Sequence, residues 1–103
     1  FSTLRAHGVR RFAVYGAGAV GRRMAADAKQ VGFDVDRIVD RNQALWNTEI
    51  LCVPVTGVDQ AFDEGCHTFV VASLTYAKEI KATLEAAGKA RGVEPQIFEL
   101  TAA

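Results

Sequence analysis

The chain has 103 residues, half of which are hydrophobic, and its 12 lysine and arginine residues balance 12 aspartate and glutamate residues. This length suits one small domain with a modest core. Zero formal charge argues against a general nucleic-acid or anionic-membrane binder, for which a basic excess is expected. No apolar stretch approaches the roughly 20 residues of a transmembrane helix. We therefore expect a cytoplasmic segment that contacts neither nucleic acid nor membrane.

Residues 1–10 are expected to form a lead-in, and the first predicted strand, residues 11–15, runs into a Gly-x-Gly-x-x-Gly turn formed by Gly16, Gly18 and Gly21. In a dinucleotide-binding turn the first glycine permits the tight turn and the second lets the backbone approach the phosphates. The third lets the following helix, here residues 18–31, pack closely on the sheet. The free N–H groups and positive dipole end of that helix attract an anion. The pattern predicts a pyrophosphate site.

The predicted helix is amphipathic and ends at Gly32, a typical residue for the end of a helix. Its expected apolar stripe consists of Val20, Met24, Ala28 and Val31, which recur at helical spacing. The order of strand, glycine turn, amphipathic helix and glycine stop is the one that a mononucleotide-binding βαβ unit requires.

The second predicted strand, residues 34–39, is followed by Asp40, which comes nineteen residues after Gly21. The dinucleotide fingerprint has a carboxylate at about this distance, where it accepts hydrogen bonds from ribose hydroxyls. Asp40 favours NAD because a carboxylate would repel the 2′-phosphate of NADP. Arg41 could reach that phosphate, so NADP stays open as an alternative.

The remaining elements alternate between short strands and helices and complete an α/β pattern. They are expected as a polar loop over 40–43, an apolar turn over 44–46, a strand at 50–55, helical turns over 58–62, a buried strand at 67–72, a helix from about 75 to 90 and a strand at 94–100. Right-handed crossovers then predict a small three-layer Rossmann-like domain with flanking helices. Its parallel sheet is expected to have four or five strands in the order 3-2-1-4-5, or a shortened version of it.

Few residues of the chain indicate catalysis. Tyr76 and Lys78 are two residues apart, whereas the short-chain dehydrogenase pair needs a spacing of four so that the lysine lowers the tyrosine pKa. Ser73 or Thr75 is expected to cap the following helix, and Ser73 could also contact a phosphate or ribose. His67 lacks a third group that would orient it. We expect no catalytic residue.

Two cysteines, two arginines and a tryptophan each allow a structural role. Cys52 and Cys66 do not have the spacing of a metal-binding pair, so we expect reduced thiols in or near the core and no metal site. Arg22 and Arg23 open the first helix, either as surface residues or as contacts for a phosphate or a partner domain. Trp46 either stacks on a nucleobase or packs beneath the loop that follows the second strand.

Five segments occur in an order typical of one group of nucleotide-binding modules: FAVYGAGAVGR at 12–22, IVDRN at 38–42, LW at 45–46, VPVTG at 53–57 and FVVAS at 69–73. They resemble the Rossmann-like N-terminal domain of polysaccharide-biosynthesis epimerases and dehydratases. They are also similar to the cap domain of sugar acyltransferases and to modules beside sugar or small-molecule methyltransferases. The resemblance spans about residues 10–100.

The resemblance implies a domain that binds NAD(P) or a nucleotide-sugar. It implies a diphosphate at Gly16–Gly21, a ribose near Asp40 and a third contact from Ala72 and Ser73. In sugar acyltransferases a left-handed hexapeptide-repeat domain follows this module, and these 103 residues contain no such repeat. The activity of that family is therefore not carried over to this chain.

We expect residues 1–103 to form one Rossmann-like nucleotide-binding domain. The chain begins with Phe1 rather than methionine, which indicates a fragment of a larger protein. No complete active site is visible, so catalysis is expected elsewhere in the parent, which the resemblance suggests is a sugar-modifying enzyme of polysaccharide biosynthesis. A homodimer, or a partner domain of the parent chain, is the expected protein partner.

The expected ligand is NAD, with NADP or a nucleotide-sugar as alternatives. A redox- or nucleotide-sensing regulatory domain and a ligand-free assembly module are the alternative functions. The expected cofactor-binding residues are Gly16, Ala17, Gly18, Ala19, Val20, Gly21, Asp40, Arg41, Ala72 and Ser73.

Overall fold

The computed structural model describes residues 1–73 and 75–99, which form a single sheet with helices on both faces. The elements in chain order are α1 (Ser2–Ala6), β1 (Arg11–Tyr15), α2 (Ala19–Gln30), β2 (Asp34–Val39), the 3-10 helix η1 (Gln43–Leu45), β3 (Glu49–Ile50), β4 (Val53–Thr56), α3 (Val58–Asp63), β5 (Thr68–Val71), α4 (Ala77–Ala90) and β6 (Gln96–Glu99). In the described residues no helix is long and apolar enough to cross a membrane.

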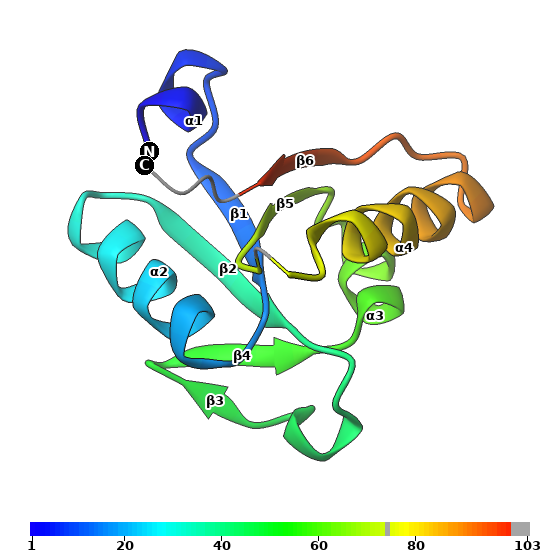
Figure 1. The fold of residues 1–103 in the computed structure, drawn as a ribbon, viewed down its shortest axis with the longest axis horizontal. Coiled ribbons are helices and arrows are strands. Elements are labelled where there is room, and N and C mark those ends of the chain that lie inside the picture. Colours follow the sequence, from blue (N-terminus) through cyan, green and yellow to red (C-terminus); the bar gives the residue numbers. More distant parts are fainter. Residues whose placement is uncertain (74, 100–103) are drawn as a thin grey trace.

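The sheet has the strand order β3-β4-β2-β1-β5-β6 (Figure 1). Strands β4, β2, β1, β5 and β6 pair in parallel, and the two-residue β3 runs antiparallel to β4 at one edge. Counted along the chain, the five parallel strands have the order 3-2-1-4-5. The predicted α/β class and strand order are therefore confirmed, with β3 as one strand more than expected.

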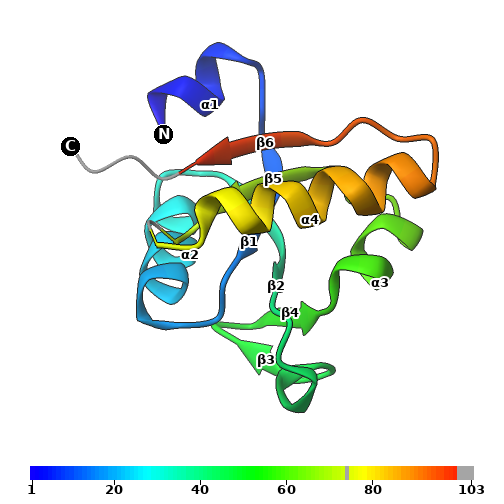
Figure 2. The ribbon, with the colours of Figure 1, turned by 45° about the vertical axis from the view of Figure 1, so that its right-hand side comes forward.

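The core has two parts because successive side chains of a strand point to opposite faces of the sheet. Helix α2 covers one face, and α3 and α4 lie side by side on the other (Figures 1 and 2). The α2 face buries Phe12, Val14, Met24, Ala25, Ala28 and Ile38, and the α3–α4 face buries Ala13, Tyr15, Phe62, Phe69 and Leu84.

The buried face of α2 differs from the predicted stripe. Met24 and Ala28 are buried as expected, but Val20 is 53% exposed and Val31 is 45% exposed. The buried positions centre on Gly21 and on small side chains, because the helix lies close to the sheet at its first turn. Val31 follows the last helical residue as the C-cap and points away from the core.

The strand predicted at 50–55 is instead a hairpin made of β3 and β4. Leu51 and Cys52 form the turn with φ values of +56° and +62°, and two successive positive φ values characterise a type I′ hairpin turn. The sequence has neither glycine nor asparagine at these positions, so the reversal carried no turn signal. Cys52 is consequently exposed rather than near the core. Cys66 is buried as expected, and burial raises the pKa of its thiol to about 11.

A buried arginine at the α3–α4 face joins four elements. Arg37 of β2 is 7% exposed, and its guanidinium donates to Asp36 Oδ2 at 2.7 Å and to Glu64 Oε1 at 2.7 Å. Arg11 of β1 pairs with the same aspartate, and Thr56 Oγ1 of β4 lies 3.5 Å from Arg37 Nη1. Each charge of the cluster thus has an opposite charge in contact, which a buried guanidinium requires.

The Asp36 carboxylate makes the stability of the fold sensitive to acid. Burial would raise the pKa of Asp36, but hydrogen bonds from Arg37 and Arg11 outweigh it, and the pKa lies below its ordinary value. A carboxyl group with a lowered pKa in the folded state stabilises the fold above its ordinary pKa. That contribution is lost as the pH falls through the lowered value.

We expect Asp36→Asn to lower the free energy of unfolding at pH 7 by about 1–3 kcal/mol, because two charged hydrogen bonds weaken. The loss of stability of the variant below about pH 4 should be smaller than that of the wild type. Urea unfolding at pH 7 and pH 3 measures both effects. Asp34→Asn is the control, because this exposed carboxylate lies 3.6 Å from Arg11 and should change little. Equal acid sensitivity in wild type and Asp36→Asn would contradict the assignment.

Candidate functional site

The carboxyl ends of β1 and β5 meet where the strand order reverses direction. From β1 the sheet continues to β2 on one side and to β5 on the other. Gly16 N donates to Val39 O at 2.8 Å and Ala72 N donates to Tyr15 O at 3.1 Å, so the loops after the three strands converge. Parallel α/β sheets bind ligands at such a switch point. The candidate site is therefore the loop set that follows β1, β2 and β5.

Two of the three glycines are required by the fold itself. Gly16 has a φ of +126°, which disfavours any residue with a side chain. A Cβ on Gly21 would lie 1.8 Å from the carbonyl oxygen of Gly16, so only glycine lets α2 approach the turn. Gly18 differs from both, because its φ is −75° and a Cβ there would meet no atom within 4 Å. Apart from the mild preference for glycine at an N-cap, the fold therefore does not require the glycine at position 18.

The first turn of α2 presents unpaired amide donors. The first intrahelical hydrogen bond runs from Arg22 N to Gly18 O at 2.9 Å. The N–H groups of Ala19, Val20 and Gly21 precede it and have no acceptor among the described residues. The first turn contains no acidic side chain that would neutralise its positive end. This arrangement suits an anion such as a phosphate.

Asp40 connects the glycine turn to the end of β2. Its Oδ2 accepts a hydrogen bond from Ala17 N at 2.9 Å, and its Oδ1 accepts one from Asn42 N at 2.8 Å. The carboxylate thus has a structural role that the sequence did not indicate. A carboxylate has about four acceptor positions, so its capacity to accept ribose hydroxyls is not exhausted. Burial, followed by the charge of Asp40, raises the pKa of Tyr15 at the end of β1.

Trp46 packs between the Asp40 loop and Gly57. Its indole Nε1 donates to the backbone oxygen of Asp40 at 2.7 Å. The ring lies against Gly57, where a Cβ would come within 2.6 Å of Trp46 Cζ2. Of the two roles considered for Trp46, the structure shows the packing role.

The predicted cofactor-binding residues lie in three neighbouring loops and in the first turn of α2. Ala17 is buried, and Ala19 and Arg41 are exposed. Ser73 Oγ accepts a hydrogen bond from Tyr76 N at 3.1 Å, but Tyr76 is the N-cap of α4 and has no side-chain cap hydrogen bond among the described residues, so the expected cap by Ser73 or Thr75 is wrong. Hydrogen bonds join Ala17 to Asp40 and Ala72 to β1, and the remaining residues follow on the same chain segments.

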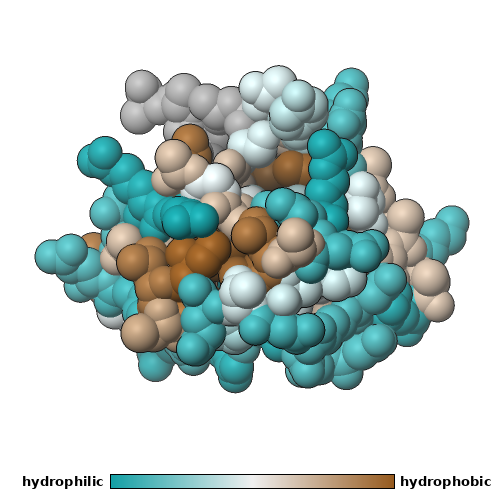
Figure 3. All heavy atoms as spheres, turned by 90° about the horizontal axis from the view of Figure 1, so that it is seen from below, coloured by the Kyte–Doolittle hydropathy of each residue, from teal (hydrophilic) through white to brown (hydrophobic). Residues whose placement is uncertain are grey.

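Two exposed hydrophobic side chains lie in the segments that follow these loops. Val20 in the first turn of α2 is 53% exposed, and Tyr76 before α4 is 55% exposed. Figure 3, seen from below Figure 1, shows a hydrophobic area bordered by hydrophilic residues. Amide donors near apolar side chains suit a ligand that combines phosphates with planar rings.

The histidine and cysteine next to β5, outside these loops, make structural contacts. The His67 ring stacks on Phe62 with centroids 5.9 Å apart, and Cys66 Sγ lies 3.8 Å from Thr68 O. The raised pKa of Cys66 keeps this thiol protonated at neutral pH. Within residues 1–73 and 75–99, no group of three or more His, Cys, Asp or Glu side chains could hold a metal ion.

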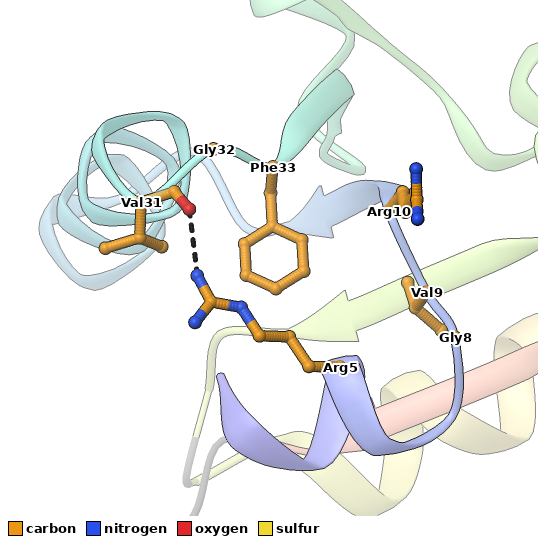
Figure 4. Close-up of a pocket in the computed structure, with 7 residues that line it drawn as sticks. All are labelled: Arg5, Gly8, Val9, Arg10, Val31, Gly32 and Phe33. Carbon is orange, nitrogen blue, oxygen red and sulfur yellow. Dashed lines mark hydrogen bonds between the residues drawn. The ribbon is translucent and has the colours of Figure 1, made fainter.

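A pocket of about 400 Å³ lies at the opposite, amino end of β1 and β2 (Figure 4). Arg5 donates to Val31 O at 2.8 Å, and its guanidinium lies 5.3 Å from the centre of the Phe33 ring. Arg5 therefore satisfies the carbonyl end of α2 and joins α1 to the rest of the domain. We assign this pocket a structural role.

No protein-family model matches the chain, and no curated protein matches it. Similar solved structures include RSP, a Rex-family repressor, with a TM-score of 0.64 and 17% identity over 97% of this chain and 58% of that chain. UDP-D-quinovosamine 4-dehydrogenase from Vibrio fischeri has a TM-score of 0.67 and 16% identity over 89% and 78% of the two chains. RSP in complex with beta-NAD+ and operator DNA has a TM-score of 0.63 and 20% identity over 96% and 48%.

The chain thus spans about half the length of the repressor chains. At these identities the likeness shows the fold alone, which is the Rossmann-type α/β fold expected from the sequence. The expectation that the chain has no nucleic-acid partner is wrong. Zero formal charge argues against a nucleic-acid partner, but a chain of the same fold has been solved with operator DNA. Net charge is a property of the whole sequence and does not exclude a DNA-binding partner for this fold.

The glycine turn makes a prediction about stability. Gly21→Ala should lower the free energy of unfolding by about 3 kcal/mol or more, because its Cβ would overlap the backbone of Gly16. Gly18→Ala should cost about 1 kcal/mol or less, since only the preference at an N-cap changes. Thermal unfolding followed by circular dichroism compares the two variants. Equal losses would show that Gly18 is also required by the fold.

Proposed function

We propose that this chain binds a dinucleotide at the glycine turn, with NAD as the preferred ligand. The observation that carries the proposal is Gly18, whose missing side chain leaves open space directly before the unpaired amides of α2. In a dinucleotide-binding turn the second glycine is the one at which the backbone approaches the pyrophosphate. A ligand thus gives a reason for the one glycine of the turn that neither backbone conformation nor steric space requires.

Three loops would share the ligand. The diphosphate would lie on the N–H groups of Ala19, Val20 and Gly21, and the ribose would lie beside Asp40. Ala72 and Ser73 would contact the part of the ligand that crosses the carboxyl end of β5. Asp40 supports NAD over NADP because its charge would repel a 2′-phosphate, and Arg41 keeps NADP as the alternative. A nucleotide-sugar shares the diphosphate and is the third candidate.

The bound nucleotide would serve a larger protein in one of two roles. The first is an enzyme of sugar-nucleotide or polysaccharide biosynthesis, which is supported by the resemblance of the five segments and by the likeness to a UDP-sugar dehydrogenase. The second is redox sensing, which is supported by the likeness to a repressor solved with NAD+ and with NADH. A sensor must distinguish NADH from NAD+, so their ratio of affinities separates the two roles. A cytoplasmic location stays a prediction.

Isothermal titration of the chain with NAD, NADH, NADP and a UDP-sugar tests the proposal. We expect NAD to bind, and Gly18→Ala to weaken NAD binding at least about 10-fold because its methyl group occupies the place of the phosphates. A thermal stability of Gly18→Ala close to that of the wild type would show that the loss of affinity is local. If none of the four ligands produces heat, the proposal is wrong and the ligand-free assembly module is left as the function.

Asp40→Asn tests the preference for NAD. The variant keeps one oxygen acceptor but loses the charge, so we expect NAD to bind about 10-fold more weakly. NADP should bind more tightly relative to NAD than in the wild type, because the repulsion of the 2′-phosphate is removed. Asp34→Asn removes an exposed charge at the other end of β2 and serves as the control. An unchanged ratio of NAD to NADP affinity would show that Asp40 does not select the ribose.

A further inference from the structure

Arg22 reaches back from α2 onto the glycine turn. It is the fourth residue of the helix, and its Nε donates to Ala17 O at 2.9 Å. Side chains of a helix tilt toward its N-terminus, so the guanidinium lies over the first turn rather than along the helix. This contact was not expected from the sequence, which left Arg22 open as a surface residue or as a contact for a phosphate or a partner domain.

The Nε contact leaves most donors of Arg22 unused. A guanidinium has five N–H donors in a planar fork, and its one hydrogen bond within residues 1–73 and 75–99 uses Nε. The two terminal amino groups stay available beside the turn that leads to the unpaired amides of Ala19, Val20 and Gly21. Arg22 therefore adds a full positive charge to amides that contribute only partial charges.

Ala17 is held from two sides by opposite charges. Asp40 Oδ2 accepts from its N–H and Arg22 Nε donates to its carbonyl oxygen. The shape of the turn is thus set by contacts within the chain before any ligand binds. A group held in this way loses little conformational freedom when a ligand binds, which favours affinity.

We propose that Arg22 binds the diphosphate of the nucleotide through its terminal amino groups while Nε keeps the turn in place. The inference rests on the proposed function and names the residue that would neutralise the charge of that ligand. The planar fork matches two phosphate oxygens at once. Ribose selection belongs to Asp40 on the other side of Ala17, so the two charged residues divide the recognition of the nucleotide.

Arg23 provides a matched control in the next position. It has the same charge, but its side chain is 86% exposed and lies 3.9 Å from Asp27 one helical turn further on. Neighbouring helix residues point about 100° apart. Arg23 therefore lies only one residue further along the chain from the glycine turn, but it lacks the contact with Ala17 that Arg22 makes.

The test compares Arg22→Gln and Arg23→Gln by titration with NAD, ADP and adenosine. We expect Arg22→Gln to weaken NAD and ADP at least about 10-fold, and to leave the affinity for adenosine, which lacks phosphate, within about 2-fold. Arg23→Gln should leave all three affinities unchanged. Added salt should weaken NAD binding less in Arg22→Gln than in the wild type, because an ionic contact is missing. Arg22→Lys keeps the positive charge without the planar fork, so its affinities for NAD and ADP should fall between those of the wild type and of Arg22→Gln.

The outcomes separate the inference from the function on which it rests. If the wild type binds NAD and Arg22→Gln binds it equally well, the inference is wrong and the proposed function stands. Equal weakening of NAD and adenosine would show that Arg22 only shapes the turn, which also overturns the inference. If Arg22→Gln does not fold, Arg22→Lys decides by the same comparison of NAD with adenosine. A wild type that binds none of the three ligands overturns the proposed function together with the inference.

Discussion

The close approach of Gly21 to the carbonyl of Gly16 is the constraint on which the rest of the structure depends. The two backbones leave no space for a side chain, so α2 begins directly at the carboxyl end of β1. From there its buried face, made of small residues and Met24, lies against β1 and β2. The same approach keeps the first turn of the helix next to the loops after β2 and β5. One steric contact thus sets both the packing of a layer and the place of the candidate site.

The charged side chains at the two ends of the sheet differ in how completely they are paired. At the amino end, Arg37, Asp36 and Glu64 pair within the chain and contribute to stability. At the carboxyl end, Asp40 and Arg22 each form a contact with Ala17 and keep unused acceptors or donors. Removing one partner of a paired buried charge destabilises a fold, whereas partly used charges on a rigid turn can still recognise a ligand. The candidate site is therefore assigned to the carboxyl end. The pocket beside Arg5 is given a structural role because this guanidinium binds Val31 O and lies against the Phe33 ring.

Much of the architecture could be predicted because its signals are local. The first two strands and α2 were predicted within one residue of their observed bounds, since alternating hydrophobic residues, glycine turns and helical spacing are short-range patterns. The hairpin of β3 and β4 escaped prediction because Leu51 and Cys52 adopt positive φ values without the usual turn residues. The exposure of Val20 and Val31 was not predicted, because helical spacing alone does not say which side of an apolar stripe meets the sheet. Arg37 gave no signal at all, since the burial of this arginine depends on Thr56 and Glu64, which come from two other elements, as well as on the neighbouring Asp36.

The sequence by itself determined the fold class, the strand order and the position of the glycine turn, because each follows from neighbouring residues and from the rules of parallel α/β connections. It also named the residues of the candidate site. Only the tertiary structure decided what each of them does for the fold. It separated Gly16 and Gly21, which the backbone requires, from Gly18, which it does not, and it showed Asp40 and Arg22 holding Ala17 from two sides. These distinctions depend on distances between segments far apart in the chain, which no local pattern records.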